Sequence, residues 1–180
     1  MTQSLSTEYW PGFGDQGYDR YHDEADVLAV VGSREGEVYR HVAPFRLSDG
    51  GRADSRRPKQ VNDCTVRALA HVSGRPYDEC YDTLAAAGRK SGRGFGFRNW
   101  ATEAEFHGLR FAWRSFPAVK GSPRVNPVTF ALRHPKGRFV LRLSKHVMAC
   151  VDGVLLDSFQ VRADRCVYGA LEVIMSRKDS

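Results

Sequence analysis

The chain has 180 residues, a length that suits one folded domain with a buried core. Its formal net charge is +6 at pH 7, which permits an acidic partner without identifying one. No apolar run approaches the roughly 18 residues of a membrane span, and Met1–Gly17 lacks the basic-then-apolar pattern of a signal peptide. We therefore expect a cytoplasmic protein with no membrane partner.

The residues before position 58 are expected to form an N-terminal extension, residues 1–57, and residues 58–180 the main domain. Val27–Val31 is a short apolar run and Glu37–Phe45 alternates loosely, with turn residues between them, so we expect a β-hairpin there. Ser48–Lys59 is rich in Gly, Arg and Asp, a composition that predicts a linker.

Helices are expected in the first part of the main domain and strands in the second. Asp63 can cap a helix over Cys64–Ser73 that ends at Gly74, and Pro76 can open another through about Ala87. Two more helices are expected at Trp100–His107 and Pro127–His134. The expected strands are Arg110–Phe116, Arg138–Leu143, His146–Val151, Val154–Phe159 and Arg165–Val173. This order predicts an α+β fold in which N-terminal helices pack on an antiparallel sheet.

Cys64 is the candidate nucleophile. It lies where a loop runs into the predicted helix, and helix N-termini favour anions through their dipole and their unpaired N–H groups. The thiolate is the reactive form of cysteine, and the same N–H groups can stabilise the oxyanion of an acyl transfer. A cysteine considered alone would more often be a small buried apolar residue, so the argument needs a base.

His146 and Asp157 supply that base and its orienting carboxylate. Asp152-Gly153 predicts a two-residue turn, which makes the flanking valines partners. Counting outwards then places His146 and Asp157 as diagonal neighbours on one face of the hairpin. Asp152, the competing carboxylate, would lie at the turn tip about 20 Å from His146. We therefore predict a catalytic triad of Cys64, His146 and Asp157.

These residues resemble the papain-like cysteine peptidase superfamily, in which the nucleophilic Cys begins the first helix, the base His opens a strand and an Asn or Asp ends the next. The strings Asn62-Asp63-Cys64-x-x-Arg67-Ala68 and Ser144-x-His146-x-x-Ala149-x-x-Asp152-Gly153-x-x-x-Asp157 are also similar to small uncharacterised papain-like proteins of bacteriophages and bacteria. The resemblance covers residues 58–170. It implies a papain-like fold and a cysteine protease or related hydrolase, with either Gln60 or Asn62 completing the oxyanion hole.

The expected reaction is hydrolysis of an amide, isopeptide or ester bond in a protein or peptide-like substrate, with a host or phage protein as the partner that the resemblance implies. A phage-encoded enzyme would act in the host cytoplasm. The chain has neither Cys-x-x-Cys nor His-x-x-x-His, so we expect no metal and no cofactor. Two alternatives stay open. One is acyl transfer or deamidation on the same triad. The other is a non-catalytic basic protein that contacts a host protein or nucleic acid through Arg52–Lys59 and Arg89–Arg98.

Overall fold

The structure is a computed structural model that describes residues 26–34, 37–96, 109–122, 124–162 and 164–175. Within these residues the chain forms three helices and one seven-stranded mixed sheet, so the expected α+β class is confirmed. The helix expected at Trp100–His107 lies outside the described residues.

The three described helices are α1 (Cys64–Ser73), α2 (Tyr77–Ala86) and α4 (Pro127–Arg133). The bounds of α1 are those that the sequence predicts. Gly74 ends it in the left-handed conformation (φ 68°) and donates its amide to the carbonyl of Ala70 at 2.9 Å. Asn126 caps α4 through its side chain, which accepts from the Thr129 amide at 2.8 Å.

The strands are β1 (Asp26–Arg34), β2 (Glu37–Leu47), β3 (Leu109–Ser115), β4 (Arg138–Leu143), β5 (His146–Val151), β6 (Val154–Asp157) and β7 (Gly169–Met175). They form the sheet in the order β1-β2-β6-β5-β4-β7-β3. The bounds of β4 and β5 match the prediction, whereas β6 ends at Asp157 rather than Phe159 and β7 begins at Gly169 rather than Arg165.

The expectation of a purely antiparallel sheet is wrong at one pair of strands. β1 and β2 form the predicted hairpin, but β2 then pairs in parallel with β6, with Phe45 opposite Leu155 and Leu47 opposite Asp157. Parallel neighbours need a long crossover, and the chain between Ser48 and Gly153 provides it. Ala43 and Phe45 of β2 are consequently buried in the same core as the later strands.

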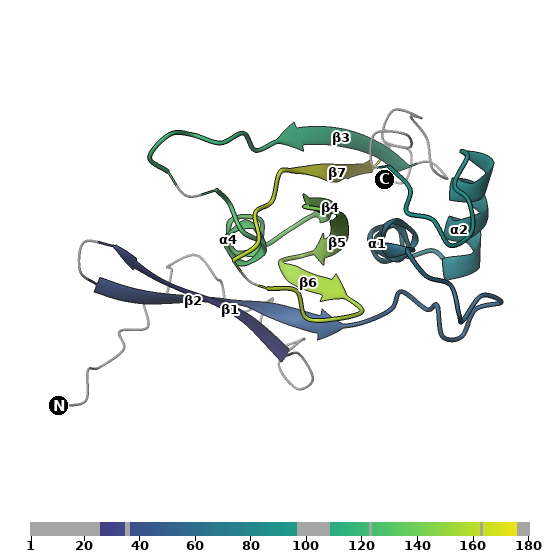
Figure 1. Cartoon of the computed structure of the whole chain (residues 1–180), viewed down its shortest axis with the longest axis horizontal. Coiled ribbons are helices and arrows are strands. Elements are labelled where there is room, and N and C mark those ends of the chain that lie inside the picture. Colours follow the sequence, from purple (N-terminus) through teal and green to yellow (C-terminus); the bar gives the residue numbers. More distant parts are fainter. Residues whose placement is uncertain (1–25, 35–36, 97–108, 123, 163, 176–180) are drawn as a thin grey trace.

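Helices cover both faces of the central strands. Helix α1, with α2 behind it, lies on one side of β4, β5 and β6, and α4 lies on the other (Figure 1). Each face has its own apolar cluster. On the α4 side the buried side chains include Phe45, Phe130, Phe139, Leu141, Met148 and Leu155. On the α1 side they include Val66, Leu69, Tyr77, Val140, Ala149 and Leu171.

The segment after β2 does not behave as the linker that its composition predicts. It is held against α2 by ion pairs, in which Arg57 contacts Asp82 at 2.6 Å and Arg56 contacts the same carboxylate at 3.0 Å. Asp78 also pairs with both arginines. The arginines of this segment thus attach it to the aspartates of α2.

Candidate active site

Cys64 is the first residue of α1, and its partly exposed thiol faces the start of β5. The side chain of His146 and the backbone amide of Val147 both lower the pKa of the Cys64 thiol, which places them beside the sulfur. Because α1 packs on β5 and β6, the helix brings the thiol to the end of the hairpin where His146 lies.

His146 and Asp157 lie at the open end of that hairpin, as its first and last strand residues. The register follows the predicted turn, with Val151 opposite Val154 and Ala149 opposite Leu156. Nε2 of His146 is hydrogen-bonded to Oδ2 of Asp157. The bond to Asp157 occupies Nε2, so Nδ1 is the ring nitrogen left for the Cys64 thiol.

The position of this pair at the end of the sheet explains how it reaches α1. Side-chain alternation assigns His146 to the face of Met148 and Cys150, which pack on the α4 side, whereas Cys64 begins a helix on the other side. Both residues of the pair lie at strand ends, and their contacts with Cys64 and Arg67 show that the two side chains reach around those ends to α1.

Opposed pKa shifts give the pair the polarity of a thiolate and an imidazolium. Burial would lower the pKa of His146, but the bond to Asp157 and the contact with Cys64 outweigh burial and raise it to about 9. Burial has the opposite effect on a thiol and would raise the pKa of Cys64. The influence of His146 and of the Val147 amide outweighs that effect, so the pKa of the thiol is lowered. The two shifts favour a proton on the imidazole and an anion on sulfur.

Arg67 is a residue of the site that the sequence argument did not single out for a role. It lies one helical turn after Cys64, is buried, and pairs with Oδ1 of Asp157 at 3.3 Å. It also donates to the hydroxyl of Ser158, whose amide in turn donates to Asp157 at 2.7 Å. The charge of Arg67 contributes to the lowered pKa of Cys64. Arg67 therefore fixes Asp157 from the side opposite His146.

The predicted capping role of Asp63 is wrong. Asp63 precedes α1, but its side chain makes no capping hydrogen bond, and its carboxylate is buried. It instead pairs with Arg67 at 3.1 Å and with Arg52 at 3.5 Å, and it accepts from the Tyr77 hydroxyl at 2.8 Å. The four-residue spacing between Asp63, just before α1, and Arg67 within it was the available signal for this buried pair.

The two candidate oxyanion residues are bonded to the loop that follows α2, at Ser91 and Gly92. The Asn62 amide donates to the carbonyl of Gly92 at 2.8 Å. The Gln60 amide donates to the carbonyl of Val61 at 3.0 Å, and its oxygen accepts from Ser91 at 3.2 Å. Both side chains thus hold the loop beside the start of α1. Each amide group carries a second N–H, so the choice between the two residues stays a prediction.

Among the residues that the structure describes, no group of three or more His, Cys, Asp or Glu side chains could bind a metal ion. None of the helices described above has the length and apolarity to cross a bilayer.

Comparison of the chain with models of protein families, with curated proteins and with solved structures finds no match.

Proposed function

We propose that this protein is a cysteine hydrolase with a papain-like fold that cleaves an amide or related acyl bond. The observation that supports this best is that Cys64, at the N-terminus of α1, lies beside His146, which is hydrogen-bonded to Asp157, and that the pKa values of the thiol and the imidazole are shifted in opposite directions. A buried structural cysteine gains no such partners; Cys150, for example, is fully buried and its thiol pKa is raised.

In the first half of the reaction the Cys64 thiolate attacks the substrate carbonyl, and the electron pair of the C=O bond moves to oxygen. The N–H groups at the start of α1 face that oxyanion, with a side-chain donor from Gln60 or Asn62. The imidazolium of His146 gives its proton to the leaving group as the bond to it breaks. The products are a thioester on Cys64 and the protonated leaving group.

In the second half, neutral His146 takes a proton from water as the water oxygen attacks the thioester. The carboxylic acid leaves, and the Cys64 thiolate and the His146 imidazolium are restored. Asp157 accepts from Nε2 throughout, so the other ring nitrogen stays directed at sulfur. Arg67 keeps the Asp157 carboxylate in place without touching the reacting atoms.

The order of elements supports the papain-like assignment. A helix that begins with the cysteine comes first, and the strands that carry the histidine and the carboxylate follow it. We further propose a protein or peptide-like substrate, either host or phage, and action in the cytoplasm.

Internal ion pairs weigh against the nucleic-acid alternative. Arg56 and Arg57 pair with the carboxylates of α2, and Arg52 pairs with Asp63. Arg89 is buried and stacks over the Tyr81 ring at 4.7 Å. These guanidinium groups already have partners within the fold, which leaves fewer of them for phosphates.

The test has two parts, carried out on separate samples of the protein: alkylation of Cys64 by iodoacetamide as a function of pH, and acylation of the unmodified thiol with p-nitrophenyl acetate. Peptide mapping separates Cys64 from Cys166, the other partly exposed thiol of the described residues. We expect rapid alkylation of Cys64 below the ordinary thiol pKa, a shift of that profile to higher pH in His146→Ala, and an acetyl thioester at Cys64. A thiol that ionises at its ordinary pKa, or a Cys64 that forms no thioester, would refute the proposal. Faster loss of the acetyl group with an added amine would indicate acyl transfer.

A further inference from the structure

A hollow of about 500 Å³ lies along the segment that follows β6. Its lining residues are Phe159, Gln160, Val161, Arg162, Asp164, Arg165 and Cys166, from the segment between β6 and β7. Two contacts join it to the candidate active site. The Phe159 ring lies 5.1 Å from the imidazole of His146, centroid to centroid, and Arg165 donates to the carbonyl of Ser144 at 2.9 Å.

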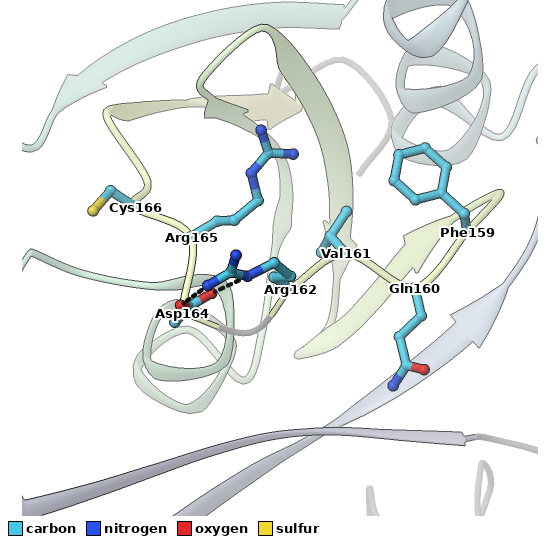
Figure 2. A pocket seen from close by; sticks show the side chains of 7 residues that line it. All are labelled: Phe159, Gln160, Val161, Arg162, Asp164, Arg165 and Cys166. Atoms are coloured by element: carbon cyan, nitrogen blue, oxygen red, sulfur yellow. Dashed lines mark hydrogen bonds and ion pairs between the residues drawn. The ribbon is translucent and has the colours of Figure 1, made fainter.

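The hollow combines an apolar floor with an excess of positive charge. Val161 is buried, and in Figure 2 the Phe159 ring and the Arg165 guanidinium lie on either side of it. Asp164 supplies the carboxylate of the lining, and it forms an ion pair with Arg162 at 2.6 Å. Arg165 is near enough to Asp164 to lower the pKa of its carboxyl group by charge, without a hydrogen bond to it. The lining thus contains two guanidinium groups and one carboxylate. The lining therefore has a net charge of +1.

The place of the hollow relative to His146 indicates which half of a substrate it would meet. In the proposed reaction His146 protonates the leaving group, so that half of the substrate must lie on the imidazole side of the scissile bond. The half-exposed Phe159 ring both contacts the imidazole and lines the hollow. A leaving group that receives the proton from His146 would thus extend over Phe159 toward Arg165.

We propose, resting on the proposed hydrolase function, that this hollow binds the leaving-group half of the substrate and selects one that carries a carboxylate, such as an acidic amino acid directly after the scissile bond. Arg165 is the selecting residue. Its bond to Ser144 uses one of five N–H donors and anchors the guanidinium two residues from His146, so the others can meet a carboxylate. Phe159 supplies the apolar contact for the carbon atoms of that group.

The test compares two aromatic disulfides that react with Cys64 by thiol–disulfide exchange. In 5,5′-dithiobis(2-nitrobenzoate) each ring carries a carboxylate, whereas 4,4′-dithiodipyridine is neutral. The background is Cys166→Ala in every protein, because Cys166 is a second partly exposed thiol. The variant is Arg165→Gln. The matched control is Lys136→Gln, which removes one exposed positive charge at the far end of the β4–β5 hairpin.

We expect Arg165→Gln to lower the ratio of the anionic to the neutral rate by about three- to fivefold, the effect of one partly exposed ion pair. The control Lys136→Gln should leave the ratio within about 1.5-fold of its starting value, because exposed charges beyond a Debye length are screened. An unchanged ratio in Arg165→Gln, or an equal change in Lys136→Gln, would overturn the selection of a carboxylate. Absence of Cys64-dependent exchange with either reagent would instead count against the hydrolase function itself.

Discussion

Replacing Arg67 by Met tests whether the buried charges beside Cys64 hold the fold and the site together. Arg67 is 7% exposed, and its two acidic partners, Asp63 and Asp157, are 2% and 4% exposed. Methionine fills a similar volume but leaves both carboxylates without this cation. Removing one member of a buried ion pair costs about 3–5 kcal/mol, because the remaining charge stays desolvated.

The expected loss is at the lower end of that range, about 3 kcal/mol, since each carboxylate keeps other partners. Asp63 retains the Tyr77 hydroxyl and Arg52, and Asp157 retains His146 and the Ser158 amide. A domain of this kind has about 5–15 kcal/mol of stability, so the variant should still fold. With a slope of about 2 kcal/mol per molar urea, the unfolding midpoint should fall by about 1.5 M.

The matched control is Arg75→Met, because Arg75 and Glu79 form an ion pair with the same four-residue spacing as Asp63 and Arg67, but at the surface. It should cost no more than about 0.5 kcal/mol. Iodoacetamide labelling provides a second readout, since loss of the Arg67 charge should raise the pKa of Cys64. If Arg67→Met is as stable as Arg75→Met and the labelling profile does not move, the reasoning about buried charge is wrong.

Two further predictions concern the titration of His146 and the end of α1. Iodoacetate is an anion that the imidazolium attracts, so its reaction with Cys64 should slow as pH rises past the His146 pKa of about 9. The reaction with neutral iodoacetamide should keep its rate over the same pH range. Parallel pH profiles for the two reagents would contradict this. Gly74→Ala should lower the free energy of unfolding by about 1 kcal/mol in urea, because φ is 68° there although a Cβ would meet nothing within 4 Å. Gly94→Ala, in open space without such a φ, should cost little, and equal losses would refute the backbone argument.

The local elements of this fold could be predicted because local residues determine them. Gly74 ends α1, and the turn Asp152-Gly153, with φ values of 48° and 78°, fixes the register of β5 and β6. That register in turn predicts that His146 and Asp157 share one face, and the structure joins them by a hydrogen bond. Capping and turn chemistry operate over a few residues, which is the range that a sequence pattern can show.

The features that could not be predicted depend on contacts between distant parts of the chain. Nothing in Glu37–Leu47 indicates that its partner is β6 rather than a strand within the extension. The cap expected at Asp63 is a frequent local choice, but Arg52 and Tyr77 offer the carboxylate buried partners that outweigh it. β2 nevertheless supports the site, because the Ser48 amide that follows it donates to the carbonyl of Asp157 at 2.7 Å.

The ionic groups beside Cys64 form one series in which positive and negative charges alternate. From the loop to the thiol the ionic contacts run Arg52, Asp63, Arg67, Asp157, His146 and Cys64, each opposite in sign to the next in the proposed thiolate–imidazolium state. The series is neutral as a whole, which limits the desolvation cost of placing so many ionic groups in and beside the core. An interior member such as Arg67 has two neighbours of opposite sign. Loss of Arg67 therefore leaves two carboxylates without their shared cation, and its effect reaches both the stability of the fold and the ionisation of Cys64.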